Sequence, residues 1–198
     1  MKRAKGPGQS VLLLLDVIDV LNKFHVPYAI IGAFAASFYG VVRASLDADA
    51  IISLQQSQMD AKMLSDKLQK IGLKITYRKG DLKDPVGAVI NAEDNFRNRV
   101  DLLMTIRGMT EDSLLRAIKT AFMGTQIRLI GIEDFIAMKI FAGSPTDLSD
   151  VDGVLRVSHG RINLSLLKEL AQNYGKGVLS KLESLLLPQE YRTRLHRG

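Results

Sequence analysis

The chain has 198 residues, with 27 lysines and arginines against 21 aspartates and glutamates, so its formal net charge is +6. Its length suffices for one well-packed core and a small helical addition. It contains no cysteine, which excludes disulfides, thiolate zinc sites and cysteine nucleophiles and agrees with a reducing cytoplasm. The three histidines, His25, His159 and His196, are too scattered to form a local zinc motif.

The N-terminal region starts with basic residues, and the apolar run that follows is interrupted at Asp16 and Asp19. A membrane-spanning helix needs about 18 or more consecutive apolar residues, so we expect an amphipathic helix here and no membrane contact. Basic residues gather near both ends of the chain, where they either attract a polyanion such as tRNA or form solvated tails. They are Lys2, Arg3, Lys5, Arg192, Arg194 and Arg197.

Strand and helix patterns alternate over the first two thirds of the chain. Apolar residues at intervals of three or four predict helices, and short apolar runs between turn residues predict strands. In chain order we expect a helix at 10–24, a strand at 28–31, a helix at 33–39, a strand at 46–54, a helix at 57–71, strands at 73–77, 86–91 and 99–105, a helix at 110–120 and a strand at 126–130.

The remainder of the chain has helical patterns only, at residues 133–141, 147–157, 164–174 and 178–187. We therefore predict an α/β fold, a mixed β-sheet flanked by helices, for a domain of residues 1–131. A C-terminal helical region follows at residues 132–198.

Two aspartates, Asp47 and Asp49, lie one residue apart on a predicted strand that continues into the apolar residues 50–52. Residues i and i+2 of a strand point to the same face, so the two carboxylates stand side by side. Like charges on an otherwise apolar strand are costly unless a cation lies between them. The alternative is the solvent face of an edge strand, although aspartate is depleted in strands.

A third carboxylate, Asp101, lies within another predicted strand between apolar residues. Taken alone, it would be an ordinary surface aspartate. Together with the pair on the earlier strand, it completes a set of hard oxygen ligands suited to one or two Mg²⁺ ions over a transferring phosphoryl group.

The pattern of Gly32-Ala33 followed by Asp47-Ala48-Asp49-Ala50 resembles the signature of the nucleotidyltransferase superfamily of the DNA polymerase-β type. That signature is Gly-Gly or Gly-Ser after an apolar residue, a spacer, and two acidic residues separated by one apolar residue. Here Ala33 replaces the second glycine or the serine.

Three further blocks resemble small bacterial nucleotidyltransferases, the AbiEii-type toxins and the minimal nucleotidyltransferases of toxin–antitoxin pairs. Their positions are residues 39–49, 131–139 and 147–151, so that the resemblance covers roughly residues 24–157. Ser144 stands where these relatives often carry arginine.

The resemblance implies that Asp47, Asp49 and Asp101 are the catalytic and metal-binding residues. Gly32, Ala33, Arg43 and Lys139 become candidates for binding the nucleotide and its phosphates. Three of these have a plainer alternative: Gly32 is a tight turn, Arg43 is a surface charge, and Lys139 is a side chain whose stem covers apolar neighbours.

The implied function is metal-dependent transfer of a nucleoside monophosphate from a nucleoside triphosphate to an acceptor hydroxyl. The acceptor is a tRNA, a protein or a small molecule, and a cognate toxin or antitoxin is a possible partner. One alternative is a catalytically degenerate fold that binds nucleotide or RNA, which Ala33 and Ser144 favour. Another is a protein-partner module whose C-terminal helices dock a cognate protein.

Overall fold

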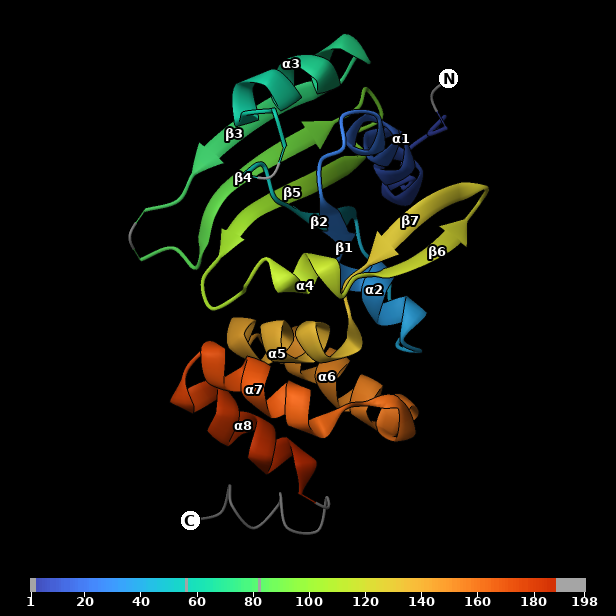
Figure 1. Cartoon of the computed structure of the whole chain (residues 1–198). Helices are drawn as coiled ribbons and strands as arrows, with labels where there is room; N and C mark the ends of the chain where they lie inside the picture. The colour runs from blue at the N-terminus through green and yellow to red at the C-terminus, as the bar shows by residue number, and fades with distance from the viewer. Residues whose placement is uncertain (1–2, 56, 82, 188–198) are drawn as a thin grey trace. The chain divides into compact units, whose positions relative to one another are not determined.

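The computed structural model describes residues 3–55, 57–81 and 83–187 (Figure 1). Contacts within the chain divide it into two compact units. The first unit consists of the chain up to Phe38 together with Val42–Ile130, and the second of Tyr39–Val41 together with the chain from Gly131 onward. The division into two domains at residue 131 stays a prediction.

A seven-stranded mixed sheet forms the centre of the first unit. The strands follow the order β3-β4-β5-β2-β1-β7-β6, in which β2 and β5, and β1 and β7, are parallel and the other neighbours antiparallel. This confirms the predicted fold class. Their bounds are β1 Tyr28–Ile30, β2 Asp47–Ile52, β3 Lys74–Lys79, β4 Val86–Glu93, β5 Arg99–Ile106, β6 Ile118–Phe122 and β7 Thr125–Leu129.

Two helices, α1 (Ser10–Lys23) and α3 (Ala61–Lys70), pack against strands β2 to β5. The apolar side of α1 is fully buried at Leu14, Val17 and Leu21. Burying one such side chain contributes about 1.5–3 kcal/mol, so this layer holds the helices to the sheet. The first unit also contains α2 (Gly32–Phe38) and α4 (Asp112–Leu115).

The predicted helix at residues 110–120 is wrong in its second half. Only α4 forms there, and Ile118–Phe122 is the edge strand β6, which pairs with β7. The two strands are joined by Met123 at φ +48° and Gly124 at φ +76°, as in a two-residue hairpin turn. Pairing with β7 therefore overrides the local helical pattern.

Helix α3 begins at Ala61, four residues later than predicted, because Asp60 caps it. The Asp60 carboxylate accepts a hydrogen bond of 2.7 Å from the backbone N–H of Met63, which satisfies one of the free donors at a helix start.

Of the basic residues near the chain ends, Arg3 is not a free tail. Its Nη1 atom donates to Asp16 and Asp19 of α1, both at 2.7 Å. Lys5 is exposed. The other residues of this group, and His196, lie outside the described residues: Lys2, Arg192, Arg194 and Arg197.

The second unit is helical, and α5 is its most buried element. Helix α5 packs against the three helices that follow it. Gly143, at φ +70°, ends α5 in the left-handed conformation that glycine adopts readily. The helices are α5 Ile132–Ala142, α6 Pro145–Ser158, α7 Leu164–Asn173 and α8 Lys176–Leu186, with a 3₁₀ turn at His159–Arg161. Among the described residues of either unit, no helix has the length and apolar content that crossing a membrane requires.

Candidate active site

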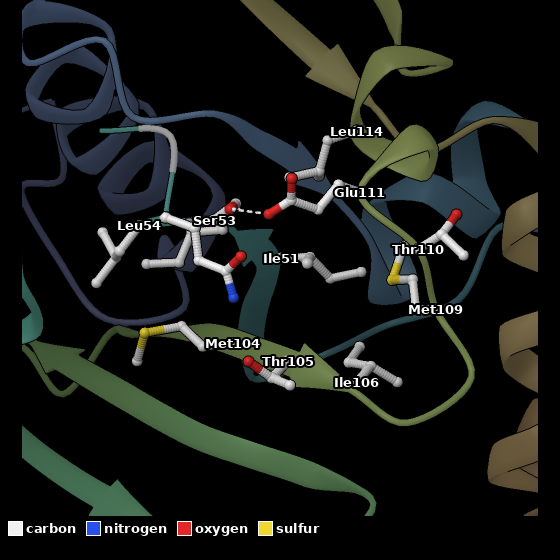
Figure 2. A pocket seen from close by; sticks show the side chains of 12 residues that line it. Ile51, Ser53, Leu54, Met104, Thr105, Ile106, Met109, Thr110, Glu111 and Leu114 are labelled. Atoms are coloured by element: carbon white, nitrogen blue, oxygen red, sulfur yellow. Dashed lines mark hydrogen bonds between the residues drawn. The ribbon is translucent and has the colours of Figure 1, made fainter. Parts of the chain in front are cut away.

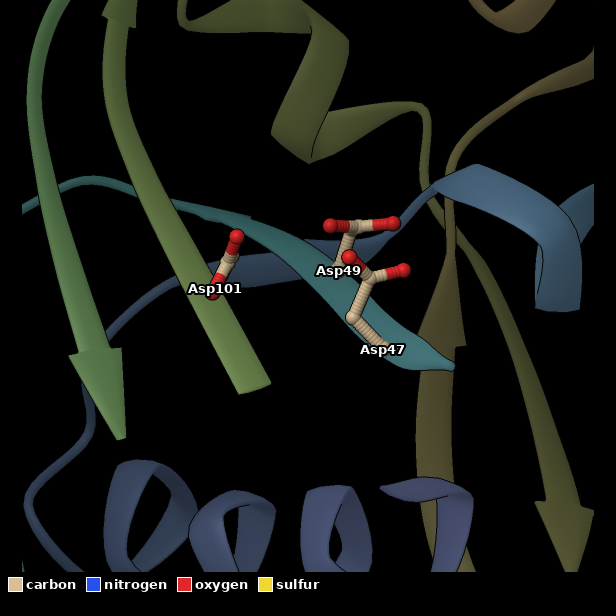
Figure 3. A group of neighbouring side chains, drawn as sticks. All are labelled: Asp47, Asp49 and Asp101. Atoms are coloured by element: carbon tan, nitrogen blue, oxygen red, sulfur yellow. The ribbon is translucent and has the colours of Figure 1, made fainter. Parts of the chain in front are cut away.

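Parallel strands β2 and β5 bring three carboxylates together (Figure 3). Asp101 lies opposite Asp49 in the register, and Asp47 precedes Asp49 by two residues on the same face of β2. One carboxylate oxygen from each residue lies within 4.8 Å of those from the other two. All three side chains are partly exposed. The result is an acidic cluster that solvent and ligands can reach.

The cluster stands on the face of the sheet that is turned away from α1, because side chains of β2 and β5 alternate between the two faces. The neighbouring residues Ala48, Val100 and Leu102 alternate with the aspartates and are buried. Helix α1 contacts both strands, and Figure 3 shows the carboxylates pointing away from it. The alternation of β2 and β5 therefore separates the apolar core from the acidic group.

Gly32 makes room for the carboxylate of Asp49. Its φ is +65°, and a Cβ at this position would overlap Asp49 Oδ2. The backbone N–H of Ile31 donates to the carbonyl oxygen of Asp49 at 3.0 Å, which ties the β1–α2 turn to β2. A larger residue would have to move the Asp49 side chain. Close approach to an aspartate is thus a reason for glycine here, separate from the predicted phosphate contact.

Arg99 places a positive charge on the cluster. Its Nη2 atom donates to Asp47 Oδ2 at 3.1 Å and to Asp101 Oδ2 at 3.0 Å. The charge of Asp101 raises the pKa of Arg99, and Asp47 and Asp49 add to this effect against the opposing effect of burial. Sequence analysis missed Arg99, although its position two residues before Asp101 places it on the same face of β5.

Two neutral side chains orient the carboxylates. Asn91 of β4 donates from Nδ2 to Asp101 Oδ1 at 2.8 Å, and these residues are partners in the β4–β5 register. Ser45 donates from Oγ to Asp47 Oδ1 at 2.7 Å. These hydrogen bonds restrict the rotation of the two carboxylates. No local pattern predicted Asn91, because only the pairing of β4 with β5 brings it to Asp101.

The three carboxylates fit a divalent cation in chemistry and spacing. Their oxygens are hard donors of the kind that Mg²⁺ and Mn²⁺ prefer. Adjacent ligands of an octahedral Mg²⁺ are about 3 Å apart and opposite ligands about 4.2 Å, so carboxylate oxygens within 4.8 Å of one another can reach one ion after rotation of the side chains. A cation bound here would also have to compete with Arg99, which already contacts two of the three carboxylates.

The predicted nucleotide-binding residues lie in different parts of the chain. Ala33 is buried in α2 next to Gly32, and Arg43 is partly buried in the segment before β2. Lys139 belongs to α5 of the second unit. The nucleotide and phosphate contacts of these four residues stay predictions.

Within the second unit, Lys139 is buried and joins two acidic residues of α6. Its Nζ atom lies 2.6 Å from Asp147 Oδ1 and 3.0 Å from Asp150 Oδ2. Burial acts to raise the pKa of Asp147, but hydrogen bonds from Lys139 and Ser144 outweigh it and lower that pKa below its usual range. This network links α5 to α6 and provides a structural reason for Lys139.

Ser144 has a local role at the start of α6. Its Oγ donates to Asp147 Oδ2 at 2.6 Å, and the backbone N–H of Asp147 donates to Ser144 Oγ at 3.1 Å. A hydroxyl and a carboxylate three residues apart are typical of a helix start. The residue that departs from the family pattern is therefore a capping residue in this chain.

Comparison with known proteins supports the fold. No family model matches the chain, and no curated protein matches it. The solved structure of ANT(2″)-Ia in complex with adenylyl-2″-tobramycin matches 84% of this chain and 97% of its own length, with a TM-score of 0.58 and 14% identity. An antigenic nucleotidyltransferase-like protein from Paracoccidioides brasiliensis matches 98% of this chain and 94% of its own, with a TM-score of 0.57 and 16% identity.

A nucleotidyltransferase-type protein from Thermotoga maritima matches 78% of this chain and 97% of its own, with a TM-score of 0.55 and 13% identity. At these identities the likeness concerns the fold, and the finer resemblance to toxin–antitoxin enzymes stays a prediction. The predicted resemblance to nucleotidyltransferases is therefore confirmed for the fold: the chain has the nucleotidyltransferase fold.

Proposed function

We propose that this protein is a metal-dependent nucleotidyltransferase that moves a nucleoside monophosphate from a nucleoside triphosphate to an acceptor hydroxyl. The observation that carries the proposal is the convergence of Asp47, Asp49 and Asp101 within 4.8 Å on neighbouring strands. The likeness of the fold to nucleotidyltransferases supports it.

Asp47, Asp49 and Asp101 would hold one or two Mg²⁺ ions. When bound, Mg²⁺ neutralises phosphate charge and helps to orient the triphosphate. The acceptor oxygen forms a bond to the α-phosphorus, the bond from that phosphorus to the β-phosphate breaks, and pyrophosphate leaves with the electron pair. The hydroxyl proton passes to Asp101 or to solvent. Asn91, which holds Asp101 Oδ1, is a positioning residue for that carboxylate.

The deciding experiment is calorimetric titration of ATP, GTP, CTP and UTP with and without Mg²⁺. Wild type is compared with Asp49→Asn and with Asp66→Asn, a control that removes the same charge from an exposed position on α3. We expect Mg²⁺-dependent binding of at least one triphosphate, weakened about tenfold or more by Asp49→Asn and unchanged by Asp66→Asn. Absence of binding to every triphosphate contradicts the proposal.

A second candidate is a degenerate fold that binds nucleotide without transferring it. Arg99 favours it, because a guanidinium that bridges Asp47 and Asp101 can take the place of a metal. Triphosphate binding that is independent of Mg²⁺ and unaffected by Asp49→Asn, with no pyrophosphate release in the presence of acceptors, identifies this alternative.

The acceptor remains a choice among tRNA, protein and small molecules. The complex of ANT(2″)-Ia contains an adenylylated form of tobramycin, which supports placing small molecules in the first round of tests. The cognate toxin or antitoxin and the cytoplasmic location are predictions from sequence. Affinity purification of the tagged chain from its native cells tests for a cognate toxin or antitoxin. Recovery of the chain without a second protein in stoichiometric amount contradicts that prediction.

A further inference from the structure

Strand β6 (Ile118–Phe122) is the edge of the sheet in the part of the chain that the structure describes. It follows β7 at the end of the strand order and has no strand on its other side (Figure 1). An unpaired strand edge is a template on which another strand can form hydrogen bonds. The backbone geometry and the side chains of β6 therefore decide what this edge can bind.

The two-residue turn after β6 fixes which of its backbone groups face outward. Phe122 and Thr125 flank this turn and are partners in the register, and such flanking residues form a hydrogen-bonded pair. Hydrogen-bonded pairs alternate with non-hydrogen-bonded pairs along an antiparallel ladder. The N–H and C=O groups of Lys119 and Ala121 therefore point away from β7, to the open edge.

The apolar side of β6 extends the buried face of β7 but is incompletely covered. Ile118 lies opposite the buried Leu129. Phe122, on the same face, meets the ring of Phe34 with 5.0 Å between the ring centroids. Yet Ile118 is 39% exposed, and Met123, directly after the strand, is 67% exposed. Apolar surface on an open strand edge favours association with another chain.

The opposite edge of the sheet is protected by charge. Strand β3 carries Lys74, Arg78 and Lys79, and all of its residues except Ile75 are exposed. Charged side chains, lysine above all, are a common means of preventing edge strands from pairing. In β6, Lys119 is the one charged residue. The sheet thus blocks pairing at β3 and leaves β6 available.

The sequence of β6 is complementary to itself about Thr120. In an antiparallel pair of two copies with the Thr120 residues opposite each other, Ile118 faces Phe122 of the second copy. Lys119 then faces Ala121 as a hydrogen-bonded pair, which agrees with the outward direction of their backbone groups. Threonine pairs, and pairs of an aromatic with a β-branched side chain, are favourable cross-strand neighbours. Pairing about Lys119 would instead place the two lysines opposite each other, which is unfavourable.

We propose that β6 is an interface between two copies of this chain, whose sheets join edge to edge in this register. A second copy suits the edge in hydrogen bonding, apolar surface and charge at once. The proposal does not depend on nucleotidyl transfer. The net charge of +6 repels two copies at long range, so the association should strengthen as salt screens that repulsion.

The interface is separate from the sites of the same unit. The acidic cluster includes two residues of β2, which is three strands from β6 in the strand order, or about 14 Å at the usual strand spacing. The first unit also has a pocket of about 240 Å³ at the ends of β2 and β5 (Figure 2), and none of its lining residues belongs to β6. Association through β6 can therefore be tested without metal or nucleotide.

The test is sedimentation equilibrium of wild type and three variants over a wide range of protein concentration. Ala121→Glu places a carboxylate opposite Lys119 of the second copy, and Ala121→Lys places a second ammonium there. Ala121 is exposed, so neither change disturbs the core. Gln126→Lys is the matched control, because Gln126 is the exposed partner of Ala121 on β7, one strand away from the edge.

We expect wild type to dimerise. Ala121→Glu should dimerise about 2- to 30-fold more tightly and Ala121→Lys more weakly by a similar factor, because each dimer contains two such pairs. Gln126→Lys should remain close to wild type. In ¹⁵N-labelled wild type, the amide protons of Lys119 and Ala121 should exchange more slowly with solvent as the protein concentration rises.

Two results overturn the proposal. One is a wild type that remains a monomer at every concentration, including the case in which β6 pairs only with a strand of a different protein. The other is a dimer whose affinity neither Ala121→Glu nor Ala121→Lys changes, since that dimer forms through another surface.

Discussion

Replacing Arg99 with glutamine is expected to strengthen metal binding at the carboxylate cluster. Arg99 contacts Asp47 at 3.1 Å and Asp101 at 3.0 Å, and these carboxylates are two of the three candidate ligands. A divalent cation and the guanidinium therefore compete for the same oxygens. Glutamine keeps much of the side-chain length and hydrogen bonding but removes the charge.

The size of the effect follows from the exposure of the ion pairs. The Arg99 side chain is 47% exposed, and exposed ion pairs contribute about 0.2–1 kcal/mol each. Two such pairs oppose the metal by about 0.4–2 kcal/mol, so Arg99→Gln should tighten Mn²⁺ binding about 2- to 30-fold. Removing the repulsion between Arg99 and the ion acts in the same direction.

Calorimetric titration of Mn²⁺ into wild type and Arg99→Gln measures this directly, without any nucleotide. The control is Arg78→Gln, which removes the same charge from the edge strand β3, where Arg78 pairs with Asp84 at 2.7 Å. Its Mn²⁺ affinity should remain that of wild type. Equal binding by Arg99→Gln would refute the reasoning, and weaker binding would in addition show that Arg99 holds the carboxylates in a ligating arrangement.

Two further variants probe the glycine turn and the buried lysine. Gly32→Ala places a Cβ at φ +65° against Asp49 Oδ2, so it should lower the free energy of unfolding by about 1–2 kcal/mol and weaken Mn²⁺ binding. Urea unfolding and calorimetry check this against Gly177→Ala, where an added Cβ would meet nothing within 4 Å. An unchanged Mn²⁺ affinity of Gly32→Ala contradicts the prediction. Lys139→Met leaves Asp147 and Asp150 without their shared cation and should cost about 3–5 kcal/mol. In wild type, the lowered pKa of Asp147 means that its contribution is complete above the ordinary aspartate pKa of about 3.9 and is lost as the pH falls below it. In Lys139→Met the effect of burial on the pKa of Asp147 is no longer outweighed by the lysine, so the loss of stability on acidification should be smaller than in wild type. Urea unfolding from pH 3 to pH 7 would contradict the assignment if both proteins followed the same profile.

Local patterns predicted most of the elements, because apolar periodicity reflects which side of an element faces the core. The paired aspartates were recognisable for the same reason: alternation along one strand places Asp47 and Asp49 on one face, whatever the rest of the fold does. Residues 118–122 were mistaken for helix, since their strand conformation depends on pairing with β7 and the local pattern does not contain that partner.

The amino-acid sequence by itself determined an α/β fold, a helical C-terminal region and a pair of acidic residues suited to a cation. Only the tertiary structure decided what surrounds that pair. The parallel register of β2 with β5 places Asp101, already a candidate from the sequence, opposite Asp49 and brings in Arg99, and the register of β4 with β5 brings in Asn91. Those contacts join residues some 50 positions apart in one case and 10 in the other. The periodicity of one strand shows which of its side chains face the core, but it does not identify the neighbouring strand, so these contacts could not be predicted from it.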